Sequence, residues 1–103
     1  MDKKKPDLAE RAAGGIGAVM QSTMYINPVW DSMTHEEEEL ILREWTVIIK
    51  QHPNRSVDHI IKDIIQRPIL AEAWAKLGKQ GQTRRRYVFE QCLENFMSNP
   101  EFI

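Results

Sequence analysis

Cysteine is almost absent from this sequence, and its scarcity limits how the fold can be held together. Cys92 is the single cysteine among 103 residues, so no intramolecular disulfide can form and a disulfide-stabilised scaffold is excluded. Such cysteine usage is typical of reducing compartments, and we therefore expect a cytoplasmic protein. At this length one apolar core can bury about two thirds of the unfolded chain's surface, which suffices for a single domain without covalent or metal cross-links.

An excess of charge of one sign is also missing. The 14 basic and 15 acidic residues give a net charge of −1, which excludes a bulk polyanion binder or a polybasic tail. The hydrophobic content of 42% excludes a generally disordered chain. Charge can therefore matter only where it is locally concentrated.

Long hydrophobic runs are absent as well. The most apolar stretch, residues 12–20, contains three glycines and has roughly half the length that a membrane-spanning helix needs. Lys3, Lys4 and Lys5 resemble the basic start of a signal peptide, but no strong apolar segment follows them. We expect neither a signal peptide nor a membrane contact.

The apolar residues that are present recur with helical spacing, and no alternating strand pattern is evident. We expect an all-α protein, a small bundle of four to five helices. Residues 1–24 are expected to form an N-terminal arm or a weak helix, because Gly14, Gly15 and Gly17 each cost about 1 kcal/mol relative to alanine in a helix. Alternatively, these small residues let another backbone approach closely. Residues 25–103 are expected to form a single helical domain.

Two segments in the middle of the chain have the clearest helical signals. Thr34 and Glu37 match a capping box, and this helix is expected to run to about Gln51. Ser56 is expected to cap the next helix. Its apolar stripe consists of Val57, Ile60, Ile61, Ile64 and Ile65, and the expected flanking ion pairs are Asp58–Lys62 and Asp63–Arg67.

Prolines mark two further boundaries. Pro28 is expected to keep Asn27 out of a helix and to make residues 25–32 a connector that packs on the core. Pro68 ends or kinks the preceding helix, and a short helix follows it.

The C-terminal part of the chain is expected to contain one more helix. Gly78 is placed to close the short helix in the left-handed conformation. A loop at residues 79–82 follows, and the last helix is expected to begin near Thr83 and to run to about Ser98, where Asn99–Pro100 terminates it.

Few residues have the spacing of a catalytic or metal site. His35 and Glu39 lie four residues apart and could face one metal ion, but a solvated helix start explains them better. Cys92 lies in an apolar stripe, where a thiol is expected to be buried and inert. The glycines at residues 14–17 lack the Gly-Lys-Ser/Thr ending of a phosphate-binding loop. We expect no enzyme activity, no cofactor and no small-molecule substrate.

The strongest functional signal is a basic segment between residues 76 and 86. If Thr83 caps the last helix, three arginines lie in its first turn, where the helix dipole disfavours cations by about 0.3–1 kcal/mol each. Arginines can bind phosphates or an acidic protein surface, or they can balance the protein's own glutamates. A helix-turn-helix motif around Gly78 fits poorly, because Trp74 stands where a small residue is needed. The basic segment contains Lys76, Lys79, Arg84, Arg85 and Arg86.

An acidic segment is its counterpart. Residues 31–44 have a local net charge of −5 and residues 76–86 one of +5, so the two segments can pair within one chain or between two copies. We expect a non-enzymatic interaction or regulatory protein that binds a partner protein, or itself as a homodimer, through an apolar helical face and charged flanks. The alternative is a nucleic-acid-binding regulator that uses the basic segment on phosphates. The expected acidic surface consists of Glu36, Glu37, Glu38 and Glu39.

Overall fold

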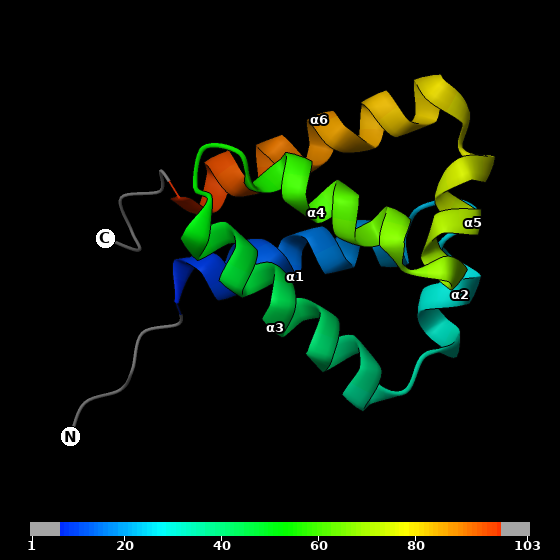
Figure 1. The fold of residues 1–103 in the computed structure, drawn as a ribbon, viewed down its shortest axis with the longest axis horizontal. Helices are drawn as coiled ribbons and strands as arrows, with labels where there is room; N and C mark the ends of the chain where they lie inside the picture. Colours follow the sequence, from blue (N-terminus) through cyan, green and yellow to red (C-terminus); the bar gives the residue numbers. More distant parts are fainter. Residues whose placement is uncertain (1–6, 98–103) are drawn as a thin grey trace.

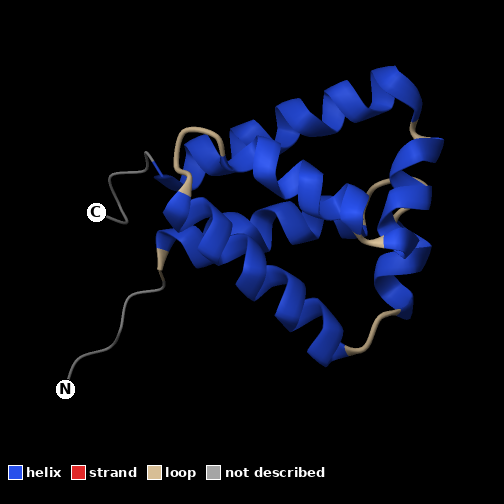
Figure 2. Ribbon diagram, viewed as in Figure 1, coloured by secondary structure: helices blue, strands red, loops and turns tan. Residues whose placement is uncertain are grey.

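The computed structural model describes residues 7–97, and all regular secondary structure in this range is helical (Figures 1 and 2). The all-α expectation is confirmed, and the segment expected as a connector contributes an additional short helix. The expected helix stop at Asn99–Pro100 lies outside the described residues. The helices are α1 (Leu8–Gln21), α2 (Asn27–Ser32), α3 (His35–Gln51), α4 (Ser56–Gln66), α5 (Pro68–Lys76) and α6 (Gly78–Met97).

The first helix, α1, packs against both α3 and α6 and forms the centre of the bundle (Figure 1). Asp7 caps it, since its carboxylate accepts a hydrogen bond of 2.9 Å from the Ala9 N–H. From Leu8 onward the segment is therefore a packed helix and not a loose arm. Its buried residues are Ala9, Ala12, Ala13, Ile16, Gly17 and Met20.

Two glycines of α1 allow this close packing. A Cβ atom at Gly15 would lie 2.9 Å from Cε2 of Phe96, and one at Gly17 would lie 2.8 Å from Cδ2 of Leu42. A Cβ atom at Gly14 would meet nothing within 4 Å. The low helix propensity of Gly15 and Gly17 is thus offset by close packing against α6 and α3. This agrees with the interpretation that small residues here let another helix approach closely.

The segment after α1 packs on the core as expected, but its conformation differs from the prediction. Asn27 is helical, because Pro28 lies in the first turn of α2, where a missing N–H costs no hydrogen bond. Trp30 is buried, and its ring stacks on that of Trp45 with 5.9 Å between the centroids. α2 thereby joins the core next to α3.

The start of α3 is as predicted. The Glu37 N–H donates to Oγ1 of Thr34 over 3.1 Å, and the Thr34 N–H donates to Oε1 of Glu37 over 2.8 Å. This reciprocal capping box satisfies two backbone donors that would otherwise lack partners. Ile41, Trp45 and Ile49 face the core.

The start of α4 contradicts the prediction in two respects. Ser56 is the first residue of the helix, and Arg55 occupies the N-cap position without a side-chain hydrogen bond. Asp58 pairs with Arg86 and Arg55, whereas we expected it to pair with Lys62. The pair with Arg86 joins α4 to α6, and the pair with Arg55 is local but lies in the opposite direction along the chain from Lys62.

The junction between α5 and α6 is tighter than expected. Gly78 adopts a φ of +72°, as predicted, but α6 begins at this same residue. The expected loop at residues 79–82 is therefore helical, and Thr83 is no cap: its hydroxyl donates to the Lys79 carbonyl inside the helix over 2.9 Å. Because the arginines at 84–86 lie beyond the first turn of α6, the predicted conflict with the helix dipole does not arise.

Candidate interaction surfaces

An apolar groove of about 340 Å³ lies between the start of α3 and the start of α5. Leu40 is 53% exposed and Ile69 is 64% exposed, whereas the neighbouring Ile41 and Leu70 are buried. The groove therefore has an apolar floor that belongs to the core and apolar walls that face solvent. We call it the α3–α5 groove; its lining residues are Met33, Glu37, Leu40, Ile41, Gln66, Arg67, Pro68, Ile69 and Leu70.

Pro68 and Arg67 position this groove. Pro68 begins α5 directly after α4 ends, because it cannot continue the hydrogen bonding of α4. The Arg67 guanidinium donates from Nε to Oδ2 of Asp63 over 2.8 Å and also donates to Glu44 on α3. Asp63 in turn accepts a hydrogen bond of 2.9 Å from the Trp45 indole N–H. These bonds tie α3 to α4 at the back of the groove, and they confirm the predicted Asp63–Arg67 pair.

The charge of Arg67 is held by these partners. Burial acts to lower its pKa, but the hydrogen bonds and charges of Asp63 and Glu44 outweigh burial and raise the pKa above its ordinary value. Arg67 thus remains charged, and its guanidinium is already engaged within the molecule.

The predicted acidic surface lies beside the groove. Glu36, Glu37 and Glu39 line a shallower hollow of about 380 Å³ together with Leu40 and Arg43. This hollow shares Glu37 and Leu40 with the groove. We call Glu36, Glu37 and Glu39 the acidic rim.

Members of the acidic rim differ in how far they are engaged. Glu37 belongs to the capping box, and Glu39 lies 3.1 Å from Nε2 of His35 in an exposed pair. Glu36 has no ion-pair partner within residues 7–97. The fourth predicted residue, Glu38, is only half-exposed and lines neither hollow.

The predicted basic segment divides into two parts. Lys79 and Arg84 are exposed and line an open hollow of about 480 Å³ with Gln80 and Thr83. Tyr87, 62% exposed, lies one turn beyond Arg84 on α6. Lys76 lies at the end of α5, and its Nζ is 3.9 Å from Oε1 of Glu72. Because this pair is long and exposed, it contributes little to stability.

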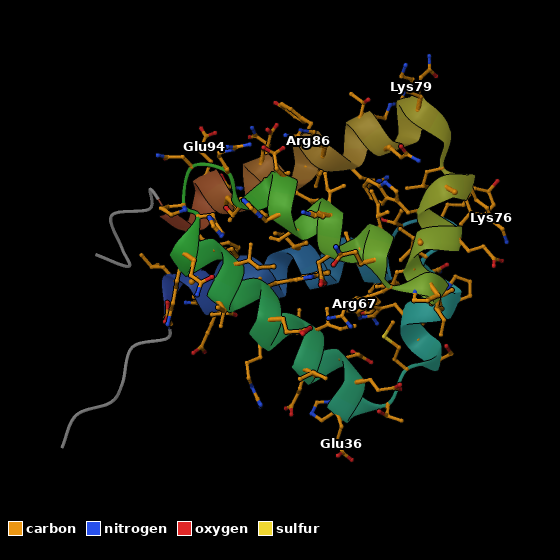
Figure 3. All side chains as sticks on the ribbon, viewed as in Figure 1. Glu36, Arg67, Lys76, Lys79, Arg86 and Glu94 are labelled. Atoms are coloured by element: carbon orange, nitrogen blue, oxygen red, sulfur yellow. The ribbon has the colours of Figure 1, made fainter. Side chains whose placement is uncertain are left out.

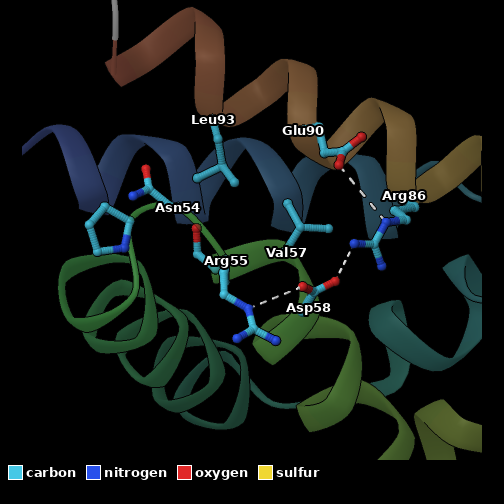
Figure 4. Close-up of a pocket in the computed structure, with 9 residues that line it drawn as sticks. Asn54, Arg55, Val57, Asp58, Arg86, Glu90 and Leu93 are labelled. Atoms are coloured by element: carbon cyan, nitrogen blue, oxygen red, sulfur yellow. Dashed lines mark hydrogen bonds and ion pairs between the residues drawn. The ribbon is translucent and has the colours of Figure 1, made fainter.

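The other part of the basic segment consists of Arg86 and the half-buried Arg85. The Arg86 guanidinium pairs with Asp58 on α4 and lies 3.9 Å from Glu90 (Figure 4). The hydrogen bond from Arg86 is the main cause that lowers the pKa of Asp58. Arg86 thus joins α4 to α6 and is partly occupied by this structural role.

A polar hollow of about 260 Å³ lies beside this ion pair (Figure 4). Its walls include two arginines, Arg55 and Arg86, and two carboxylates, Asp58 and Glu90, so its charges are balanced. Ser56 also lines it, and the Ser56 hydroxyl is buried without a hydrogen-bond partner among the described residues. The balance of charge gives this hollow no clear preference for an anion or a cation.

The acidic and basic surfaces lie on opposite edges of the molecule. Figure 3 shows Glu36 at one edge, on α3, and Lys79 and Arg86 at the other, on α6. No ion pair within residues 7–97 joins Glu36–Glu39 to the segment 76–86. The predicted pairing of the two segments inside one chain is therefore not found in this part of the protein.

His35, Glu39 and Cys92 were the candidates for a metal or catalytic site. His35 and Glu39 form the exposed pair described above, and the part of the chain that the structure describes brings no three His, Cys, Asp or Glu side chains together as metal ligands. Cys92 is half-buried near Gly15 of α1, and burial raises the pKa of its thiol, which keeps it protonated and weakly reactive.

Sequence reasoning missed Ile69 as a surface residue. Ile69 and Leu70 are adjacent and both apolar, so only the direction in which α5 leaves Pro68 decides which of them faces solvent. It also missed the stacking of His52 on His59, whose ring centroids are 3.9 Å apart. His52 follows α3 and His59 lies in α4, and the two are separated by the turn that joins these helices. Helical periodicity therefore could not predict that their rings lie close together.

Comparisons with known proteins leave the interpretation to the geometry. No protein-family model, no curated protein and no solved structure matches this chain. Within residues 7–97, none of the helices combines the length and the apolar character that crossing a membrane requires.

Proposed function

We propose that this chain is a non-enzymatic interaction or regulatory protein that binds a segment of a partner protein in the α3–α5 groove. The observation that carries the proposal is the exposure of Leu40 and Ile69 on opposite walls of a hollow whose floor is the protein core. Exposed apolar side chains that gather around a hollow mark interaction sites more often than scattered ones do. The single cysteine supports a cytoplasmic setting for this activity.

The groove suits an apolar anchor residue on a helical or extended segment. Its volume of about 340 Å³ holds one or two side chains, and burial of one such side chain contributes about 1.5–3 kcal/mol. The acidic rim beside it favours a segment that also carries lysine or arginine, since complementary charge raises the association rate and disfavours acidic competitors.

Selection of peptides from a displayed random library tests this proposal. We expect selected peptides to share large apolar residues and to bind the wild-type protein about tenfold or more tightly than the Ile69→Asp variant. Ile65→Asp is the matched control, because Ile65 is 54% exposed on α4 and does not line the groove. Peptides that bind wild type, Ile69→Asp and Ile65→Asp equally would contradict the proposal.

Nucleic-acid binding is a second candidate, favoured by one observation. Lys79, Arg84 and Tyr87 are exposed along α6, and cations beside an exposed aromatic ring suit a phosphate backbone and its bases. A mobility-shift assay with mixed-sequence DNA and RNA tests it at low and high salt. Retardation that weakens steeply with salt and is lost in Lys79→Ala/Arg84→Ala supports this candidate, and absence of retardation at low salt contradicts it.

A further inference from the structure

One chain carries two complementary surfaces that it cannot bring together. Glu36 of the acidic rim, beside the α3–α5 groove, lies at one edge of the molecule, and Lys79 of the exposed basic segment lies at the opposite edge (Figure 3). Within residues 7–97, neither Glu36 nor Arg84 has an ion-pair partner. We propose that a second copy of this chain occupies the groove with its α6, placing Tyr87 in the hollow and Arg84 against the acidic rim. This inference rests on the proposed function of the groove.

Spacing along α6 supports this choice of occupant. Gln80, Arg84 and Tyr87 are separated by four and three residues, so they lie on one stripe of the helix, with Lys79 and Thr83 beside it. The stripe thus presents one large aromatic side chain with a cation one turn before it. Tyrosine and arginine, together with tryptophan, are enriched among the dominant contacts of protein interfaces.

Within residues 7–97, no other exposed aromatic residue is equally suited. Tyr25 is the other aromatic side chain in this range with substantial exposure. Residues 12–42 around it contain no lysine or arginine, so a copy that used Tyr25 would bring no positive charge to the acidic rim. Tyr87 satisfies both the apolar and the electrostatic requirement.

The contact joins two different surfaces on opposite edges of the molecule, so it is heterologous. It is made once per chain in a head-to-tail series, which either closes into a ring or stays open. In both cases the association depends on concentration, and because it includes exposed charges it weakens as salt screens them.

Sedimentation velocity of the wild-type chain is the first test. We expect species larger than the monomer at tens of micromolar protein in about 50 mM salt, and a shift toward monomer in about 500 mM salt. Tyr87→Ala and Ile69→Asp should each weaken the association about tenfold, whereas Ile65→Asp should leave it unchanged.

A charge exchange is the decisive test. Glu36→Lys/Glu39→Lys gives a chain with two basic surfaces, and Lys79→Glu/Arg84→Glu gives one with two acidic surfaces; Glu37 is kept because it caps α3. We expect each variant alone to be monomeric and an equimolar mixture to associate. All these side chains are exposed, and circular dichroism confirms that each variant folds.

The outcomes separate this inference from the proposed function. A wild-type chain that stays monomeric under all these conditions, or a mixture that does not associate, overturns the second copy as occupant. If the displayed peptides still bind in an Ile69-dependent manner, the proposed function stands with another protein as partner. If neither peptides nor a second copy bind through Ile69, both proposals are wrong.

Discussion

The two ends of α3 are built differently, and the difference separates a part joined by ion pairs from a part with exposed apolar side chains. At its C-terminal end Lys50 lies 2.5 Å from Asp7, the cap of α1. α4 begins near this end of α3 (Figure 1), and the Asp58–Arg86 pair joins α4 to α6 (Figure 4). At its N-terminal end α3 borders the groove, with Leu40 exposed. We call the first region the closed end and the second the open end.

Side-chain size separates the core from the groove. Small residues of α1 face α3 and α6, where the helices approach closely and the intervening space is filled. In the groove, Leu40 of α3 and Ile69 of α5 stay exposed, and Pro68 starts α5 directly after α4 ends. Apolar residues therefore contribute stability in the core and binding capacity in the groove.

The largest expected effect comes from the same substitution made once in the core and once in the groove at the open end. Ile16 is fully buried in α1, and Ile16→Ala should lower the free energy of unfolding by about 2–5 kcal/mol, because it leaves a cavity in the core. Ile69→Ala at the open end should change it by less than about 0.5 kcal/mol. Urea denaturation measures both values, and equal losses would show that the groove residue belongs to the core.

The glycines of α1 give a second contrast, within a single helix. Gly17→Leu should destabilise the protein by about 1–3 kcal/mol, because the added side chain meets Leu42 and Trp30. Gly14→Ala should stabilise it by about 0.5–1 kcal/mol, since it has open space and gains helix propensity. Thermal unfolding followed by circular dichroism distinguishes the two signs. If both variants were destabilised, tight packing at Gly17 would not be the cause.

A third prediction concerns the ion pairs of Arg67, which join α4 to the middle of α3. Arg67→Ala should cost about 1–2 kcal/mol, because Glu44 and the partly buried Asp63 lose a charged hydrogen-bond donor. The control Lys76→Ala removes an exposed pair at 3.9 Å and should have almost no effect. Denaturant titration of the two variants side by side tests whether Arg67 holds α3 to α4.

A smaller expected effect is a weakening of the closed end in acid. The hydrogen bond from Lys50 lowers the pKa of Asp7, and the hydrogen bond from Arg86 lowers the pKa of Asp58. Because both pKa values lie below the unfolded value of about 3.8, this stabilisation is present above that pH and is lost as the pH falls further. The urea midpoint measured from pH 7 to pH 2.5 should fall less steeply for Asp58→Asn than for the wild type.

The histidine pair adds a separate step at higher pH. Burial, followed by the charges of His52, Arg55 and Lys62, lowers the pKa of His59 below its ordinary value of 6.5. Protonation therefore favours the unfolded chain, and stability should decline slightly as the pH falls through this range. His59→Gln should remove the decline between pH 7 and pH 5; an unchanged decline would assign it to other groups.

Predictions from local sequence were right where one turn of helix contains all the determinants. The Thr34–Glu37 capping box, the left-handed Gly78 and the Asp63–Arg67 pair each involve residues no more than four positions apart. Predictions failed where a distant partner competes. Asp58 pairs with Arg86, twenty-eight residues away. The predicted cap at Ser56 was also wrong, because α4 begins at Ser56 itself.

The candidate site was predictable only in part. The acidic rim was recognisable from the run of glutamates, but its position beside an apolar groove depends on how α5 packs. The basic segment was recognised for a reason that the structure removes, because α6 begins at Gly78 and not at Thr83. The structural feature that still indicates a binding role for this segment is the exposure of Lys79 and Arg84 next to Tyr87.

By itself, the sequence determined that this protein is helical, where several helices begin and end, and where charge is concentrated. These features depend on propensity, capping and periodicity, which act over a few residues. Only the tertiary structure decided which glycines permit close packing, which of Ile69 and Leu70 faces solvent, and that the acidic and basic segments lie on opposite edges. Those outcomes depend on which helices pack against each other. Helix packing is decided by contacts between residues distant in sequence, so no single stretch of the chain encodes it.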